Sequence, residues 1–216
     1  DTDVAGNVGS DTEAVIIKDT TAPTGSITSP ANGLTFTSNP PFTASSNDTN
    51  GVSSVKFQYK ASTSDSFIDM NTDISVPFEA DWGGISLVSN TTYDLKIIVK
   101  DTAGNSATFF GVSFTYDITA PDQPIITNPA SSISVNSDNY SIQGTAEAGS
   151  LVKVYSNLSV VGSRQLSGAE TAFNISVSLT QNAINSFKVS STDSVGNESV
   201  KTTVSVITED SIDPGI

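Results

Sequence analysis

Carboxylates are the side chains of this sequence best able to do chemistry. The chain has 23 Asp and Glu residues against 9 Lys and Arg, a formal net charge of -14, and neither His nor Cys. Histidine-based triads, thiol nucleophiles and zinc sites with His or Cys ligands are therefore excluded. Two chemistries remain open to the carboxylates: a catalytic pair for glycoside hydrolysis, and an oxygen cage for a hard cation such as calcium.

The charge balance also bears on partners. The nine basic residues are scattered along the chain, whereas a phosphate backbone is bound mainly by clusters of Lys and Arg. No run of residues approaches the roughly 20 apolar positions of a transmembrane helix. We therefore expect no nucleic-acid partner and no membrane insertion in this segment.

Many of the acidic residues belong to two motifs that recur in step. The first motif is Asp-x-x-Gly-Asn, found at 3–7, 101–105 and 193–197. The second is Asp-x-Thr-Ala-Pro, found at 19–23 and 117–121, with a degraded copy at 210–214. A catalytic pair need appear only once, so acidic residues that recur periodically at turns indicate a structural role and predict a protein that is not an enzyme.

The spacing of the motifs predicts domains. Each Asp-x-x-Gly-Asn motif begins 98 or 92 positions after the previous one, which is the length of an immunoglobulin-like domain. The second motif begins 16 positions after the first, enough for a turn and one strand. Alternating apolar residues flank the turn, as in Leu95-x-Ile97-x-Val99, so the motif is interpreted as the turn between the last two strands of a sandwich.

Composition agrees with an all-β chain. Hydrophobic residues make up 36% and charged residues 15%, and most of the remainder is Ser, Thr, Asn, Asp and Gly. We predict tandem immunoglobulin-like β-sandwich domains arranged end to end. The expected boundaries are a C-terminal hairpin of a preceding repeat at 1–19, complete domains at 20–117 and 118–209, and a linker to a next repeat at 210–216.

The placement of the aromatic residues distinguishes a structural domain from a carbohydrate-binding one. Trp82 falls in a predicted strand at 76–82, and Tyr59, Tyr116 and Tyr155 lie in runs typical of strands, so all four are interpreted as sheet or core residues. A row of exposed, coplanar rings would instead indicate a carbohydrate-binding face.

The sequence resembles a known family. The phrase GTAEAGSLVKV at 144–154, followed by FNISVSL and FKVSSTDSVGN, is similar to the bacterial immunoglobulin-like tandem repeats of large cell-surface adhesins. The earlier phrases NGVSSVKFQYK, VPFEADW and TYDLKIIVKDTAGN resemble a related class of the same module. The resemblance covers essentially the whole chain.

This resemblance implies calcium sites. In adhesin repeats, acidic residues at domain junctions bind calcium, which by motif points to Asp117, Glu147 and Asp193. The domain at 20–117 has SNDTNG in place of the AEAG phrase, which leaves Asp48 as the substitute for Glu147.

Geometry leads to the same residues. In an immunoglobulin sandwich the B–C loop, the F–G loop and the incoming linker lie at one end, so their carboxylates can converge. In the domain at 20–117, the same argument predicts that Asp19, Asp48 and Asp101 lie close together. The alternative is that each Asp only caps its own turn.

The predicted function is that of a structural stalk or adhesive repeat region of a secreted or cell-surface protein, with calcium stiffening the joints. Its expected partners are neighbouring repeats of the same chain and a surface receptor or glycan. The alternative is a carbohydrate-binding or accessory module of a secreted multidomain enzyme, or a subunit of an extracellular filament.

Overall fold

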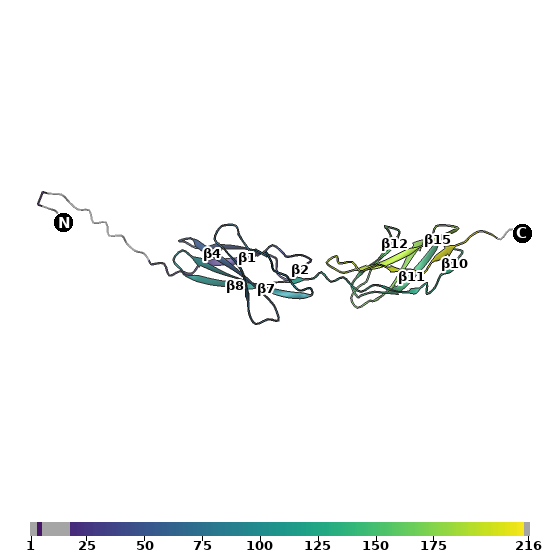
Figure 1. Cartoon of the computed structure of the whole chain (residues 1–216), viewed down its shortest axis with the longest axis horizontal. Coiled ribbons are helices and arrows are strands. Elements are labelled where there is room, and N and C mark those ends of the chain that lie inside the picture. Colours follow the sequence, from purple (N-terminus) through teal and green to yellow (C-terminus); the bar gives the residue numbers. More distant parts are fainter. Residues whose placement is uncertain (1–3, 6–17, 214–216) are drawn as a thin grey trace. The chain divides into compact units, whose positions relative to one another are not determined.

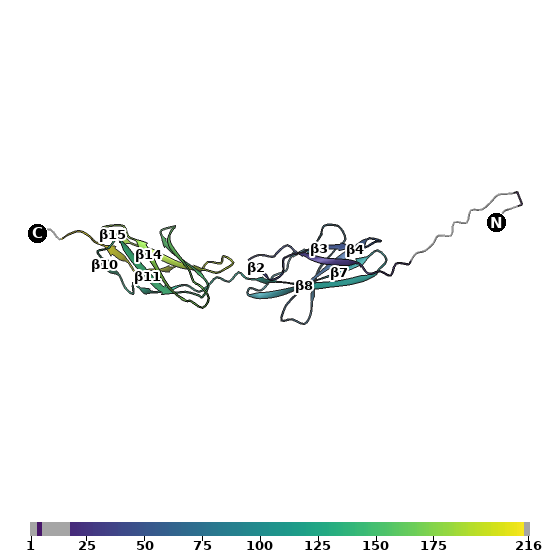
Figure 2. The same cartoon turned by 180° about the vertical axis from the view of Figure 1, so that it is seen from behind.

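The computed structural model describes residues 4–5 and 18–213, and all regular structure within them is β-strand (Figures 1 and 2). The predicted hairpin at 1–19 lies almost wholly outside the described residues, as does the last part of the predicted linker, from 214 on. No described segment forms a helix long and apolar enough to cross a membrane.

The chain divides into two compact units. The first contains the described residues up to Leu34, Pro40–Ile85 and Thr92–Phe114, and the second contains Thr35–Asn39, Ser86–Thr91 and the described residues from Thr115 onward. We call the sheets formed by strands β1–β8 the first sandwich and those formed by β9–β18 the second sandwich.

The first sandwich has two sheets. The larger has the order β2 (Leu34–Phe36), β8 (Ser106–Tyr116), β7 (Thr91–Asp101), β4 (Val52–Ala61) and β5 (Ile68–Asp73). The smaller has the order β1 (Thr24–Ser29), β3 (Thr43–Asn47) and β6 (Phe78–Glu79).

Strict alternation builds the core of the first sandwich. Along β7, Leu95, Ile97 and Val99 are fully buried, and the antiparallel register places Val55 opposite Val99 and Phe57 opposite Ile97. Because side chains alternate across a strand, the intervening residues of β4 and β7 face outward. This explains why charged residues such as Lys56 and Lys96 share one face of the sheet.

Trp82 is half-buried and packs against the first core, but it does not lie in a strand. Only Phe78–Glu79 of the predicted strand at 76–82 pairs with β3, and Trp82 lies in the following loop. Its ring contacts those of Phe42 and Phe114, and its Nε1 donates to the carbonyl of Pro40 at 2.7 Å. Since the indole N–H is satisfied, the ring packs without the cost of an unpaired donor.

The second sandwich contains three sheets. Their strand orders are β13 (Ser159–Gln165), β12 (Leu151–Ser156), β16 (Phe187–Thr192) and β17 (Thr202–Thr203); β14 (Ala172–Ser178), β11 (Asn139–Thr145) and β9 (Ile125–Asn128); and β10 (Ile133–Val135), β18 (Ile207–Glu209) and β15 (Ala183–Asn185). Its core is continuous and includes Ile142, Val154, Phe173, Val189 and Ile207.

The C-terminal end of the second sandwich differs from a simple hairpin. The segment after the turn at 193–197 pairs with β16 through an isolated bridge from Glu198 to Thr192 and again over Thr202–Thr203, and the chain then forms β18, which runs parallel to β10. Val200 is exposed, whereas Val204 is buried. The final strand is therefore divided into two short strands, β17 paired with β16 and β18 paired with β10 and β15, which the sequence pattern did not predict.

Candidate metal centre

Both described copies of Asp-x-x-Gly-Asn form the same turn. The amide of Asp101 donates to the carbonyl of Asn105, and that of Asp193 donates to the carbonyl of Asn197, at 3.0 Å in both cases. The Asp101 carboxylate accepts from the amides of Gly104 and Asn105 at 2.6 and 2.8 Å. The left-handed backbone of Gly104, with φ 100°, makes this turn accessible.

The Asn of each motif connects the turn to the incoming linker. Nδ2 of Asn105 donates to Oδ2 of Asp101 at 2.8 Å and to the main-chain carbonyl of Asp19 at 3.3 Å. In the second sandwich Nδ2 of Asn197 donates to Oδ2 of Asp193 at 2.7 Å and to the carbonyl of Asp117 at 3.2 Å. The two sequence motifs therefore recur together because they contact each other.

The turns favour ionised carboxylates. Burial alone would raise the pKa of Asp101, but hydrogen bonds from the Asn105 side chain and from the amides of the turn outweigh it, so the pKa lies below the ordinary value of 3.8. Burial likewise opposes ionisation of Asp193, and the equivalent hydrogen bonds lower its pKa. Each turn thus presents a fixed negative charge at the end of the sandwich where the linker enters.

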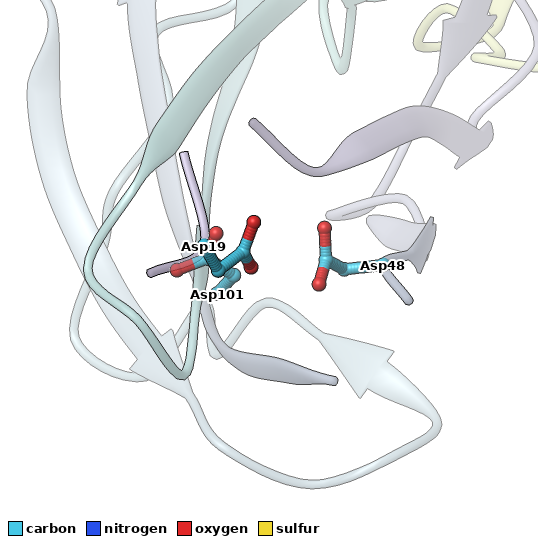
Figure 3. A group of neighbouring side chains, drawn as sticks. All are labelled: Asp19, Asp48 and Asp101. Carbon is cyan, nitrogen blue, oxygen red and sulfur yellow. The ribbon is translucent and has the colours of Figure 1, made fainter. Parts of the chain in front are cut away.

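The first sandwich brings three predicted ligands together. One carboxylate oxygen from each of Asp19, Asp48 and Asp101 lies within 4.8 Å of the others. In Figure 3 the carboxylate of Asp48, from the loop between β3 and β4, faces those of Asp19 and Asp101. Asp101 is fully buried and the other two are partly buried.

The cluster fits a hard cation. Oδ1 of Asp19 accepts from the amide of Thr21 at 2.9 Å, but its Oδ2 is buried without any hydrogen-bond partner. A buried, unpaired carboxylate oxygen is costly, and a divalent cation would satisfy it. Oδ1 of Asp48 accepts from the amide of Asn50 at 2.8 Å, which fixes the orientation of this carboxylate. The turn-capping interpretation is thus correct for these residues, and it is compatible with binding a metal.

The second trio is arranged more loosely. Asp117, Glu147 and Asp193 line one cavity of ≈350 Å³ together with the hydroxyl-bearing residues Ser150 and Thr119. Within the described part of the chain, however, only the first trio has ligand oxygens grouped within 4.8 Å. Glu147 is exposed, and Oδ1 of Asp117 is held by the amide of Thr119 at 2.9 Å. These three residues therefore line one cavity, but their carboxylate oxygens do not all lie within 4.8 Å of one another.

Sequence reasoning missed the role of Asn105 and Asn197. The motif was interpreted only as a turn, whereas each of these side chains also reaches the linker at least 80 positions earlier in the chain. The signal that could have revealed this contact is the fixed spacing between the two motifs, since a turn and a linker that bond each other must recur together.

Comparison with known proteins agrees with the architecture. Residues 23–97 and 126–208 each match a family described as Bacterial Ig domain, and together the matches cover more than half of the chain. Among the curated proteins none is a significant match.

Solved structures give the same fold. The fibronectin(III)-like modules of Clostridium thermocellum CbhA have a TM-score of 0.53 at 18% identity, over 87% of this chain and 95% of that one. Lower similarity is found to a Ca2+-stabilized adhesin that helps an Antarctic bacterium bind ice, with a TM-score of 0.39 at 19% identity, over 88% of this chain and 48% of that one. A 1.5-MDa bacterial ice-binding adhesin has a TM-score of 0.37 at 18% identity, over 79% of this chain and 57% of that one. Both sandwiches of this chain belong to the bacterial immunoglobulin-like domains, and they occur in tandem.

Proposed function

We propose that this chain is a non-catalytic, load-bearing repeat region of a secreted or cell-surface protein, in which calcium ties each incoming linker to the domain that follows it. The observation that carries the proposal is the cluster of Asp19, Asp48 and Asp101, whose carboxylate oxygens approach within 4.8 Å of one another and include one buried oxygen without a partner.

The three ligands come from segments that must stay together for the linker to stay in place. Asp19 precedes β1, Asp48 lies between β3 and β4, and Asp101 ends β7. Without a cation these like charges repel one another at short range, and the linker is held mainly by the hydrogen bond from Asn105. A divalent ion reverses the repulsion, so that the linker, the loop between β3 and β4 and the turn between β7 and β8 become one rigid element.

The same role is proposed for Asp117, Glu147 and Asp193 in the second sandwich. Glu147 is exposed and its side chain is long enough to adopt several rotamers, so it can swing into the cavity when a cation is present. The second site then forms on binding, whereas the first is already assembled, and the second should have the lower affinity because it must order a side chain.

The proposal is tested by calorimetric titration of the whole chain with calcium. Wild type should give two binding events of different affinity, and the double variant Asp19→Asn, Asp48→Asn should lose the tighter one. Asn keeps the capping oxygens that accept from Thr21 and Asn50, so the turns are preserved while charge is removed. Asp65→Asn is the matched control, because Asp65 is exposed in a loop of the same sandwich. Absence of heat from the wild type would refute the calcium role.

A further inference from the structure

The outer face of the larger sheet of the first sandwich contains a groove that the proposed calcium role does not use. Its volume is ≈660 Å³, and its lining combines two aromatic rings with charged and polar side chains: Phe67, Phe110, Lys60, Lys96, Asp94 and Asn32. A concave surface with apolar rings and a few convergent polar groups is the usual form of a small-ligand site. We call it the β7–β8 groove.

Phe110 is the most exposed ring in the groove. Its side chain is 75% exposed, although it lies within β8, an interior strand of a five-stranded sheet. Phe109 packs inward near Gly25, so the regular alternation of β8 points Phe110 outward. The alternation then changes phase, because Phe114 is also buried. Gly111, with φ 107°, permits this change, and a Cβ at that position would meet no atom within 4 Å. The chain therefore exposes a large apolar ring beside open space.

The sheet face that carries the groove is basic on an acidic chain, and Lys60 and Lys96 line the groove itself. Four of the nine basic residues lie on the outward face of β4 and β7, namely Lys56, Lys60, Lys96 and Lys100. Lys60 is neutralised by Asp94 at 3.2 Å and donates to the carbonyl of Ser64 at 2.8 Å. Nζ of Lys96 instead lies 4.1 Å from the centroid of the Phe67 ring and takes part in none of the three ion pairs found among the described residues. Within the described part of the chain, Lys96 thus forms no direct ion pair, although the Asp69 carboxylate lies near enough to interact with its charge.

A hydrogen-bond donor is also held in place. Oδ1 of Asn32 accepts from both the amide and the hydroxyl of Ser113, at 2.9 and 3.2 Å. These two bonds fix the plane of the Asn32 amide and leave its Nδ2 group on the side away from Ser113, able to donate to a ligand. Such pre-organisation lowers the entropy cost of binding.

We propose that the β7–β8 groove binds an acidic oligosaccharide, a chain of carboxylate-bearing sugars. The apolar face of a sugar ring would stack on Phe110, its carboxylate would pair with Lys96, and its hydroxyls would bond Asn32 and Asp94. The positive charge of Lys96 selects an anionic ligand. The exposed face of the Phe110 ring offers a flat apolar surface on which a sugar ring can stack, which favours an oligosaccharide over a peptide.

The test is calorimetric titration of the whole chain with short oligogalacturonate in the presence of chelator, so that the calcium sites play no part. Phe110→Ala and Lys96→Gln should each weaken binding by about fivefold or more, while Phe110→Trp should retain it. Matched controls are Leu158→Ala and Lys188→Gln, which remove an exposed apolar and an exposed basic side chain from the second sandwich. Both controls should bind as the wild type does, and raising the salt concentration should weaken all binding.

Three results with oligosaccharides would overturn the proposal, and so would one result with a peptide. They are the absence of binding to oligogalacturonate, equal affinity for a neutral glucan oligomer, and unchanged affinity in both Phe110→Ala and Lys96→Gln. Tighter binding of oligoglutamate than of oligogalacturonate would also contradict it, because it would identify an acidic peptide as the ligand class. Since calcium is absent throughout, failure here leaves the proposed calcium role untouched.

Discussion

Nδ2 of Asn105 donates to the main-chain carbonyl of Asp19, 86 positions earlier in the chain, and the equivalent bond from Asn197 to Asp117 spans 80 positions. Each bond joins the last turn of a sandwich to the linker that precedes its first strand. The linker is thereby positioned by the domain that it leads into, and this contact places the Asp19 side chain beside Asp101.

Replacing this amide should loosen the linker. Asn105→Ala removes the bonds to Asp19 and to the Asp101 carboxylate, so the free energy of unfolding should fall by about 1–3 kcal/mol. Chemical denaturation measures this, and hydrogen exchange should become faster at the amide of Thr21. Asn50→Ala is the control, because its exposed side chain lies in a turn of the same sandwich. Equal stability of the two variants would show that the bond to the linker contributes little.

Acid should destabilise both sandwiches. The pKa values of Asp101 and Asp193 lie below 3.8 in the folded chain, so on acidification the unfolded state takes up protons first. The stabilisation is therefore fully present above about pH 4 and is lost as the pH falls through the lowered pKa values. Urea unfolding at a series of pH values in chelator should show this decline below about pH 4. A free energy of unfolding that rises on acidification would contradict the prediction.

Glu209 should be essential to the second sandwich. It is fully buried in β18, where its carboxylate accepts from the amide of Asn182 at 2.5 Å and from the hydroxyl of Ser211. Glu209→Ala leaves the Asn182 amide without this acceptor and should lower the free energy of unfolding by about 1–3 kcal/mol. Asp213→Ala, an exposed change nearby, should have no measurable effect. If thermal unfolding found both variants equal to wild type, the carboxylate would have no structural role.

Gly144 leaves no room for a side chain. A Cβ at this position would lie 2.1 Å from the carbonyl oxygen of Ile125 and 2.7 Å from Cζ of Phe173. Gly144→Ala should therefore force β9 away from β11 and lower the free energy of unfolding by about 1–3 kcal/mol or more. Loss of protection from hydrogen exchange should be centred on β9. Undiminished stability would mean that β9 moves at little cost.

Much of the fold could be predicted from the sequence, since alternation and turn chemistry are local properties. The alternating run Leu95, Ile97 and Val99 lies in the strand before the turn, as expected, and the turns at Asp101 and Asp193 have the expected form. The features that could not be predicted depend on distant partners. The short strand β10 has no signal of its own, and β18 exists because it pairs with β10 and β15.

The candidate site could also be predicted only in part from the sequence. Recurring motifs identified the segments that carry Asp19, Asp48 and Asp101, but the approach of their oxygens to within 4.8 Å depends on side-chain rotamers and on the bond from Asn105. The resemblance singled out Glu147, whereas the structure assembles the trio with Asp48 in the equivalent loop. A short Asp side chain that is held by its own turn reaches its neighbours in one conformation, whereas a longer, exposed Glu side chain can adopt many conformations.

The central claim, that calcium stiffens the entry end of the first sandwich through Asp19, Asp48 and Asp101, is tested most directly by thermal unfolding of wild type and Asp48→Asn in calcium and in chelator. A ligand that binds only the folded state adds about 2.7 kcal/mol of stability at a hundredfold excess over Kd. The wild-type melting temperature should therefore rise with calcium and fall with chelator, and Asp48→Asn should lose the part of this shift that belongs to the first sandwich, while Asp65→Asn keeps it all. A melting temperature that calcium and chelator leave unchanged in the wild type would contradict the account.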